Sequence, residues 1–291
     1  MTTMHRILVT GGGGQLAHAI EWVAKGHDVE LFAPTHAECD ITSAESLREA
    51  MKGMDVVINT AAYTNVDGAE RNMEDAHRVN VVGAREVAIV AQEMGVKVIH
   101  ISTDYVFGGD TNRNRPYGER EEVSPINVYG STKAKGEEEV LRHGGIVIRT
   151  SWLYSPWGKN FCRTILRNAK VRNALRVVDD QRGTPTSALS LARVLIYIIE
   201  SGEYRTMTGV YHYTNKGNAS WYEFAREIVA RAAIEGCEVT PCSSDEWPAE
   251  ARRPHYSCLD TERLRAMDIP MEEWHEALEE VITIIGQDDD I

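Results

Sequence analysis

The chain has 291 residues, a net charge of −13, and ordinary shares of apolar (43%) and charged (26%) residues, which fits one large globular domain or two modest lobes. The negative charge disfavours nucleic acid as a partner. No segment approaches the roughly 20 consecutive apolar residues of a membrane span. We therefore expect no membrane partner. The five scattered cysteines include no Cys-x-x-Cys pair, so we expect no metal or disulfide framework and a reducing, cytoplasmic location.

Short apolar runs alternate with helical patterns in the N-terminal half, which is typical of βαβ units and a parallel sheet. The predicted strands are 7–10, 29–32, 56–61, 96–102 and 146–150, and the predicted helices are 15–25, 43–51, 72–94 and 126–141. The C-terminal half is less regular. It is predicted to hold helices over 160–170, 187–199, 220–232, 261–267 and 271–285 and a strand over 210–213.

This pattern predicts an α/β fold class, with a doubly wound parallel sheet of the Rossmann type and a smaller α/β C-terminal substrate lobe. We expect residues 1–150 to form the dinucleotide-binding domain, completed by parts of about 187–235. Residues 151–186 and 236–291 are then expected to form the substrate lobe. Asn218 or Ser220 is the expected cap of the helix over 220–232.

A glycine cluster follows the first predicted strand directly. The spacing Gly11-x-x-Gly14-x-x-Ala17, with Gly13 inside it, is that of a dinucleotide-binding turn. Glycine is needed where the chain turns tightly and where backbone N–H groups approach a pyrophosphate, and the third position needs only a small residue. A strand before the cluster and a helix after it supply the context that this motif requires.

The loop after the second strand bears on cofactor choice. Leu31-Phe32 is followed by Ala33-Pro34-Thr35-His36, where an acid would bind a ribose 2′-OH and repel a 2′-phosphate. Without that acid, Thr35 or His36 could donate to a 2′-phosphate, although His36 could equally be an exposed loop residue. The expected cofactor is NADPH or NADH, with a lean to NADPH or to use of both.

Tyr129 and Lys133 are four residues apart in a predicted helix, which places both side chains on one face. A lysine ammonium one turn away would stabilise the phenolate and lower the tyrosine pKa. Thr103 directly follows the predicted strand over 96–102, and ligands of parallel sheets bind at the carboxyl ends of strands. A hydroxyl would therefore stand where a carbonyl oxygen reacts.

The segment 159–178 is basic in an acidic protein. It carries Lys159, Arg163, Arg167, Lys170, Arg172 and Arg176 and no acid. We interpret this segment, with Arg182, either as a dock for a diphosphate or as a solvated helix face.

A series of different short motifs is spread along the chain from residue 6 to about 285. They are Val9-Thr10-Gly11, Asn59-Thr60-Ala61-Ala62-Tyr63-Thr64, Val66-Asp67, Val79-Asn80, Ser102-Thr103-Asp104-Tyr105-Val106-Phe107, Asn127-Val128-Tyr129-Gly130, Arg149-Thr150-Ser151-Trp152, Asn160-Phe161, Asp180-Gln181-x-Gly183-x-Pro185-Thr186, Arg253-Pro254 and Ser257-x-Leu259-Asp260. Together they closely resemble the dTDP-4-dehydrorhamnose reductases, a branch of the extended short-chain dehydrogenase/reductase family. The resemblance implies reduction of a 4-keto sugar carried on dTDP, in the synthesis of cell-surface polysaccharide precursors.

The resemblance also implies roles for single residues. Tyr129 would be the proton donor, Lys133 would lower its pKa and hold the nicotinamide ribose, and Thr103 would bond the reacting oxygen. The implied substrate contacts are Thr103, Asp104, Tyr129 and Trp152. The implied cofactor contacts, with the glycine turn included, are Gly11, Gly13, Gly14, Gln15, Leu16, Asp40, Ile41, Ala62, Tyr63, Thr64, Tyr129 and Lys133. Some relatives form a magnesium-bridged dimer built on glutamates, and Gln15 stands at one such position, so we expect no metal and leave a homodimer open.

Several alternatives stay open. Trp152 could be core packing, Asp104 could cap the following turn, Asp40 could cap the next helix, and Tyr63 could only pack in a loop. His100 lies in mid-strand and is expected to be a core histidine with its hydrogen bonds satisfied. The family resemblance also leaves room for another nucleotide-sugar epimerase, dehydratase or reductase on the same scaffold. A non-catalytic regulatory subunit of the methionine adenosyltransferase type is a further alternative.

Overall fold

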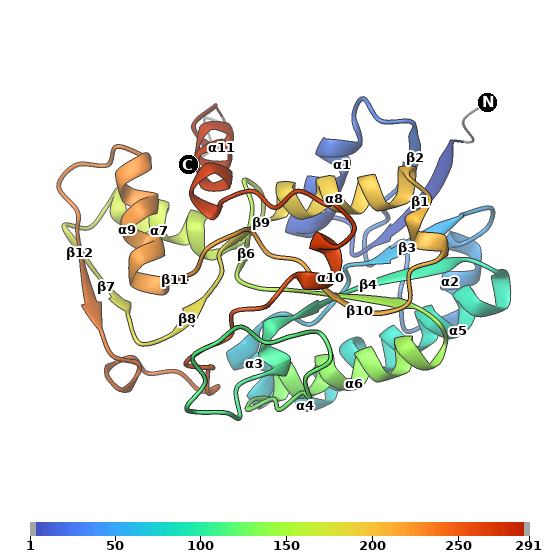
Figure 1. Cartoon of the computed structure of the whole chain (residues 1–291), viewed down its shortest axis with the longest axis horizontal. Helices are drawn as coiled ribbons and strands as arrows, with labels where there is room; N and C mark the ends of the chain where they lie inside the picture. The colour runs from blue at the N-terminus through green and yellow to red at the C-terminus, as the bar shows by residue number, and fades with distance from the viewer. Residues whose placement is uncertain (1–3, 288–291) are drawn as a thin grey trace.

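The computed structural model describes residues 4–287 and is built on a six-stranded sheet (Figure 1). All neighbouring strands are parallel, in the order β10-β5-β4-β3-β1-β2. The strands are β1 (His5–Thr10), β2 (Val29–Phe32), β3 (Val56–Asn59), β4 (Lys97–Thr103), β5 (Ile146–Thr150) and β10 (Gly209–His212). The predicted doubly wound parallel sheet is confirmed.

Helices cover both faces of this sheet, because alternate strand residues point into two separate cores. Ile7 and Val9 of β1 join one core with α1 (Gln15–Ala24) and α8 (Ala188–Glu200). Leu8 and Val57 point the other way, into a core with α2 (Ala44–Ala50), α5 (Ala84–Met94) and α6 (Val128–Arg142). In Figure 1, α1 and α8 lie above the sheet and α5 and α6 lie below it. Burial on both faces explains the continuous Val/Ile runs of the strands.

The helix predicted over 72–94 is confirmed from Met73 to Met94, with a π-helical stretch inside it. Short helices α3 (Val66–Arg71) and α4 (Met73–His77) precede a π-helical turn, η1 (Arg78–Gly83), before α5 begins. The turn lies against α6 at Gly136, where a Cβ atom would be 2.2 Å from the Asn80 carbonyl oxygen. The π-helical stretch thus lies where two helices pack closely, and the apolar pattern of the sequence does not indicate it.

The C-terminal lobe combines helices with short strand pairs. Its helices are α7 (Phe161–Ala169), α9 (Trp221–Arg231), α10 (Glu262–Arg265) and α11 (Trp274–Gln287). Its strand pairs are β7 (Ala174–Val178) with β12 (Glu238–Cys242), β8 (Arg182–Gly183) with β11 (Ala219–Ser220), and β6 (Leu153–Tyr154) with β9 (Thr186–Ser187). None of these strands was predicted. Four of them, β6, β8, β9 and β11, have only two residues and leave almost no periodic signal. Ser220 is the cap of α9, in a capping box with Glu223.

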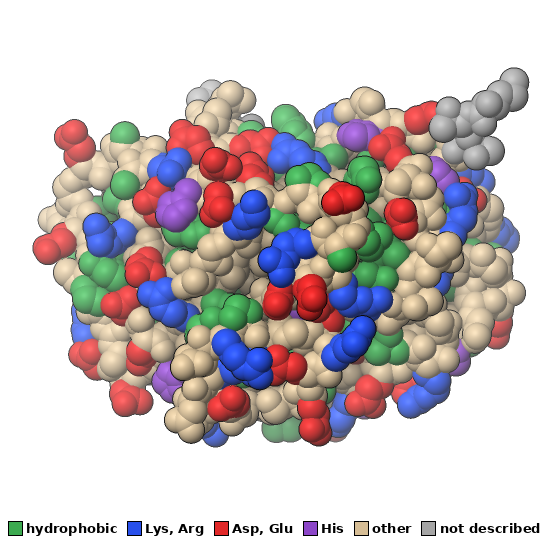
Figure 2. All heavy atoms as spheres, viewed as in Figure 1, with side chains coloured by type: hydrophobic (Ala, Val, Ile, Leu, Met, Phe, Trp, Pro, Cys, Tyr) green, Lys and Arg blue, Asp and Glu red, His purple; other side chains and the backbone are tan. Residues whose placement is uncertain are grey.

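The chain crosses between sheet and lobe more than once. β10 pairs with β5 and α8 packs on α1, whereas α9 packs on α7 and α11. The division into two domains remains a prediction. No helix within residues 4–287 is long and apolar enough to cross a membrane. Acidic and basic side chains are interspersed on the face seen in Figure 2, without a uniformly basic surface.

Candidate active site

Three segments that carry predicted site residues lie at the carboxyl ends of β1, β3 and β4. The chain passes from β1 outward to β2 and then returns to place β3 on the other side of β1. This reversal is the switch point at which doubly wound sheets bind ligands. The glycine loop follows β1, residues 60–64 follow β3, and Thr103 ends β4, so the sheet brings the three segments to one edge.

The glycine loop has the backbone that its sequence predicts. Gly11 and Gly13 have φ angles of 77° and 85°, in the left-handed region that favours glycine. A Cβ atom on Gly12 would lie 2.2 Å from the Ala33 carbonyl oxygen, so the loop after β2 also needs glycine there. Gly14 begins α1 without a side-chain cap, and the first turn of α1 holds no acid. The positive end of α1 is therefore not neutralised by its own side chains.

Two observations fit this loop to an anionic dinucleotide. A Cβ atom on Gly13 would meet no atom within 4 Å, so the loop borders open space. The side-chain Oε1 of Gln15 is buried and has no hydrogen-bond partner within residues 4–287, although its Nε2 donates to the Leu153 carbonyl at 3.3 Å. The N–H groups at the uncapped helix start can bind a pyrophosphate in the open space beside them. The unpaired amide oxygen of Gln15 can accept from a ribose hydroxyl.

Three other predicted cofactor residues, Leu16, Asp40 and Ile41, have side chains that the structure places in the cores or in a turn. Leu16 and Ile41 are buried in the two cores, so their side chains do not line a cleft. Asp40 accepts hydrogen bonds from the backbone N–H and the hydroxyl of Thr42, which lower the pKa of its carboxyl. The cap of α2 is Ser43, so Asp40 shapes the turn before that helix. Asp40 and Ile41 as cofactor contacts remain predictions.

Residues 62–64 form a partly exposed segment after β3, and Asn80 fixes its centre. The Asn80 side chain accepts from the Tyr63 N–H (2.8 Å) and donates to the Tyr63 carbonyl (3.2 Å) and to the Thr132 hydroxyl (3.0 Å). Asn80 thus ties the segment with Ala62, Tyr63 and Thr64 to α6. Sequence reasoning gave Asn80 no role, and its polar side chain at a buried helical position was the available signal.

The loop after β2 requires a correction. Glu38, two residues beyond the run examined in the sequence, folds back and accepts the Thr35 N–H and hydroxyl, both at 2.8 Å. These bonds lower the pKa of the Glu38 carboxyl. A carboxylate therefore does stand near the end of β2, and Thr35 is already engaged with it, while His36 is exposed.

Helix α6 brings Tyr129 against the end of β4. Asn127 caps the helix by accepting the Gly130 N–H at 2.7 Å. A Cβ atom on Gly130 would lie 2.0 Å from the Tyr105 carbonyl oxygen, so only glycine lets the first turn of α6 approach the 3-10 turn η2 (Asp104–Val106). The Tyr129 ring then packs edge-to-face on Tyr105, with 5.9 Å between ring centroids.

The protonation of Tyr129 differs from the sequence-based expectation. Burial raises the pKa of the Tyr129 phenol to about 12, with the Thr103 hydroxyl opposing and the Asp104 carboxyl adding to the rise. Lys133 does not offset this, because its Nζ donates to the Ile101 carbonyl (2.7 Å) and faces His100 Nε2 (3.2 Å). Burial also lowers the pKa of Lys133 to about 8. Without a bound cofactor the phenol therefore holds its proton at neutral pH.

Asp104 is a buried carboxyl with hydroxyl partners. Its Oδ2 accepts the Ser257 hydroxyl at 2.5 Å and its Oδ1 accepts the Thr103 hydroxyl at 3.2 Å. Burial raises the pKa of Asp104 to about 7 despite these bonds. The hydroxyl that caps η2 belongs to Thr103, which accepts the Tyr105 N–H at 3.1 Å, so Asp104 does not cap this turn.

Trp152 follows β5 with a φ of 45°, which is uncommon for a bulky residue. Its indole stacks on Trp221 of α9, with centroids 3.5 Å apart and planes within 4°. A Cβ atom on Gly183 would lie 2.3 Å from the Trp152 ring, so glycine is required on this side of the indole. Packing thus occupies Trp152, and its contact with substrate remains a prediction.

Thr150 is a candidate site residue that sequence reasoning missed. It is the register partner of Thr103, so both side chains lie on the same face of the sheet at its ligand edge. Its Oγ1 is buried and has no hydrogen-bond partner within residues 4–287. The motif Arg149-Thr150-Ser151-Trp152 marked the position, but nothing in the sequence showed that the hydroxyl would be unpaired.

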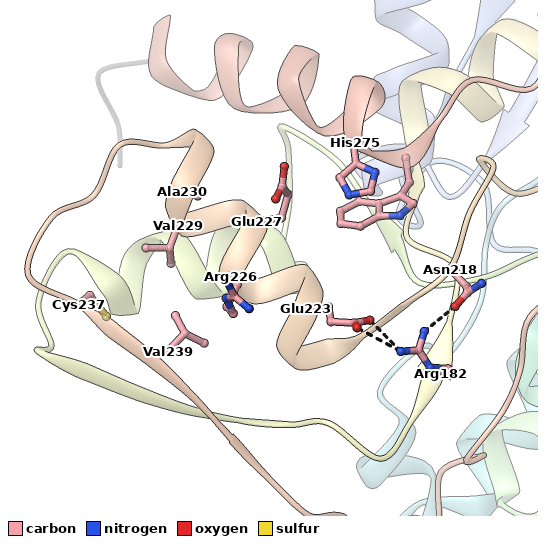
Figure 3. Close-up of a pocket in the computed structure, with 11 residues that line it drawn as sticks. Arg182, Asn218, Glu223, Arg226, Glu227, Val229, Ala230, Cys237, Val239 and His275 are labelled. Atoms are coloured by element: carbon pink, nitrogen blue, oxygen red, sulfur yellow. Dashed lines mark hydrogen bonds and ion pairs between the residues drawn. The ribbon is translucent and has the colours of Figure 1, made fainter.

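The basic segment 159–178 belongs to the lobe, and several of its arginines have local partners. Arg163 donates to the Pro156 carbonyl and Arg176 pairs with Glu246. Arg182 bonds Asn218 and Glu223 at the edge of an open hollow of about 580 Å³ beside α9 (Figure 3). Apart from Arg182, no residue predicted to touch cofactor or substrate lines this hollow. The role of the segment as a diphosphate dock remains a prediction.

A doubly wound sheet with a glycine loop after β1 and a Tyr/Lys pair beside a strand-end threonine defines an NAD(P)H-dependent oxidoreductase of the extended short-chain type. Residues 4–286 match the family described as the RmlD substrate binding domain. The chain belongs to this family, that of the dTDP-4-dehydrorhamnose reductases, as its sequence motifs predicted.

Individual relatives agree along nearly the whole chain. A dTDP-4-dehydrorhamnose reductase of Mycolicibacterium smegmatis is 38% identical over 96% of this chain and 86% of its own. A dTDP-4-keto-6-deoxy-D-glucose reductase of Streptomyces niveus is 35% identical over 98% of this chain and 99% of its own. The crystal structure of the Bacillus anthracis dTDP-4-dehydrorhamnose reductase in complex with NADP has a TM-score of 0.90 and 36% identity, and the match covers 97% of this chain and 99% of that one.

Proposed function

We propose that this chain reduces the C4 keto group of dTDP-4-dehydro-L-rhamnose to give dTDP-L-rhamnose, with NADPH or NADH as the reductant. One observation carries the proposal. A partly buried, protonated phenol, Tyr129, stands beside the Thr103 hydroxyl at the carboxyl end of β4, and the uncapped start of α1 follows β1 at the same edge of the sheet. The names of the relatives point to the same chemistry and to polysaccharide precursor synthesis.

The chain's own residues would manage the proton and the charge. When bound, the reduced nicotinamide supplies the hydride that C4 accepts. The carbonyl oxygen then becomes an alkoxide, which is a stronger base than the phenolate of Tyr129, so the phenol can protonate it. The Thr103 hydroxyl would orient that oxygen, and the Lys133 ammonium would hold the nicotinamide ribose. Gly11, Gly13, Gly14 and Gln15 would bind the diphosphate and its ribose.

The assay uses purified protein, NADPH or NADH, and dTDP-4-dehydro-L-rhamnose, and follows loss of reduced nicotinamide. Tyr129→Phe should lower kcat by about 100-fold or more while leaving the Kd of NADPH nearly unchanged, because only the transferable proton is removed. Tyr105→Phe is the matched control, since it removes a neighbouring buried phenol and should keep kcat within a few-fold. Equal turnover by Tyr129→Phe and the wild type would reject the role of Tyr129.

The same assay tests the sugar and the rival functions. The Streptomyces niveus relative is named for a different 4-keto sugar, so dTDP-4-keto-6-deoxy-D-glucose is the comparison substrate. A reductase consumes one reduced nicotinamide per product, whereas an epimerase or dehydratase returns its cofactor to the starting state. Cofactor consumption that matches product formation therefore separates the two classes.

We further propose a cytoplasmic protein that can form homodimers. All five cysteines are unpaired thiols, which suits a reducing compartment (Cys39, Cys162, Cys237, Cys242 and Cys258). Size-exclusion chromatography with light scattering tests the assembly, and a monomer at all concentrations would reject the dimer. Fractionation of cells that express the chain tests the location.

A further inference from the structure

A line of buried polar side chains crosses the sheet beneath α6, from the glycine loop to Lys133. Thr10, Asn59 and His100 are register partners on β1, β3 and β4, so they lie at one level of the sheet. These three side chains and that of Lys133 are at most 2% exposed. Thr10 Oγ1 lies 2.7 Å from Asn59 Oδ1, Asn59 Nδ2 lies 3.0 Å from His100 Nδ1, and His100 Nε2 lies 3.2 Å from Lys133 Nζ.

The number of N–H and O–H donors restricts which hydrogen bonds these four side chains can make with one another. A lysine ammonium has three donors and no acceptor, so His100 Nε2 must be unprotonated to accept from Lys133. The proton of a neutral ring then sits on Nδ1 and must be donated to Asn59. The oxygen and nitrogen of a side-chain amide exchange places by a simple flip, and the flipped Asn59 would accept from His100 and donate to Thr10. This arrangement satisfies the amide and both ring nitrogens.

The surroundings favour a neutral ring and a charged lysine. Burial and the Lys133 charge hold the pKa of His100 well below its usual range. Glu137, one turn along α6, opposes the effect of burial on the pKa of Lys133, but its carboxylate is already bonded by Arg149 and the Ser102 hydroxyl. The titratable side chains that face Lys133 are Glu137, one turn along α6, and His100, from β4. The ring of His100 is the side-chain acceptor that bonds the ammonium.

We propose that His100 is a positioning residue for Lys133: its neutral ring accepts an N–H of the ammonium at Nε2, and Asn59 holds the ring in the Nδ1-protonated form. The Ile101 carbonyl takes a second N–H, at 2.7 Å. The third N–H is left for a ligand, which on the proposed function is the nicotinamide ribose. His100 thus sets the place of the ammonium without touching cofactor or substrate. Asn59 and Thr10 connect that place to the strand that leads into the glycine loop.

The first test needs neither cofactor nor substrate. Nitrogen NMR of the ¹⁵N-histidine-labelled full chain distinguishes the two neutral ring forms and the charged ring, and His100→Gln identifies the signals of His100 by their loss. We expect a protonated Nδ1 and an unprotonated Nε2 at neutral pH. A protonated Nε2, or a charged ring, would overturn the proposal.

The second test compares two substitutions of His100. His100→Leu leaves a buried ammonium donor unpaired, so the pKa of Lys133 should fall, the alkaline limb of kcat/KM should move down by about one pH unit, and the Kd of NADPH should rise about tenfold. In His100→Gln the amide oxygen can accept from Lys133. The alkaline limb of kcat/KM should then return to its wild-type position, and the Kd of NADPH should lie within about threefold of wild type. Wild-type values in His100→Leu would also overturn the proposal.

The matched control is His212→Leu. His212 is another buried histidine of the same sheet, but it faces Arg149 and the Asp260 carbonyl rather than Lys133. Its loss should lower the Tm without moving the alkaline limb or the Kd of NADPH. If His100→Leu does not fold, the NMR result and His100→Gln still decide. If the wild type reduces no dTDP-linked keto sugar, the proposed function fails, while the ring form and the Kd of NADPH still test His100.

Discussion

Replacing Asp104 by asparagine should stabilise the protein, and more strongly at high pH. Asp104 is 2% exposed and its pKa is raised from 3.8 to about 7, so the folded state disfavours its charged form. The unfolded chain loses this proton near pH 4, whereas the folded chain keeps it to about pH 7. Between these values the folded state binds more protons, so the free energy of unfolding falls as pH rises through this window and is constant above it.

The magnitude follows from the size of the shift. Each pKa unit corresponds to 1.36 kcal/mol, so the carboxyl costs about 4 kcal/mol at pH 8 relative to low pH, and about 3 kcal/mol of this loss falls between pH 4.5 and 8. The asparagine side chain does not titrate and can still accept the Ser257 hydroxyl. The stability gained by Asp104→Asn should therefore be about 3 kcal/mol larger at pH 8 than at pH 4.5, or about 6 °C in Tm.

The assay is urea unfolding of both proteins at the two pH values. Effects of other groups cancel in the difference between the proteins. Asp67→Asn is a control of opposite sign, because Arg253 lowers the pKa of the Asp67 carboxyl and its loss should destabilise most at high pH. An equal gain from Asp104→Asn at both pH values would show that Asp104 is ionised in the folded protein, and would refute the reasoning.

Two further substitutions test the geometry of the site. Gly130→Ala places a Cβ atom 2.0 Å from the Tyr105 carbonyl oxygen, so α6 must shift. Steady-state kinetics should show a kcat about 100-fold lower, and thermal unfolding should show a loss of stability of about 1–3 kcal/mol. Ser131→Ala on the same helix should change neither, and wild-type activity in Gly130→Ala would contradict the close approach. Thr150→Val removes the unpaired hydroxyl at nearly constant shape, so kcat/KM for the sugar should fall about tenfold while the Kd of NADPH holds. Thr150→Ser should retain activity, and a wild-type kcat/KM in Thr150→Val would show that this hydroxyl does not meet the substrate.

The parts of the fold that sequence could predict are those fixed by local rules. The glycine turn depends on backbone angles at Gly11 and Gly13, and the strand before it depends on a continuous apolar run. Helix α6 begins at Val128, within two residues of the predicted start, so the face shared by Tyr129 and Lys133 was available from spacing alone. These features need no information from distant segments.

The parts that could not be predicted depend on distant partners. Spacing placed Lys133 near Tyr129, but whether its ammonium turns to the phenol or to β4 is decided by His100, 33 residues away. The expectation that His100 is a satisfied core histidine is confirmed, but the identity of its partners is a property of strand order. The π-helical stretch within the helix predicted over 72–94 likewise lies where Gly136 of α6 approaches Asn80.

The row of polar side chains on β1, β3 and β4 also bears on how the sheet assembles. Strands made of valine and isoleucine can slide past each other by two residues and still bury apolar surface on both sides, so such sequences specify alignment weakly. Thr10, Asn59 and His100 find their partners at only one alignment. Any slippage would strand an amide or an imidazole among hydrocarbon side chains, at a cost of about 1–3 kcal/mol for each group. The three residues whose hydrogen bonds lead to Lys133 would therefore also make misaligned strand pairs less stable during folding.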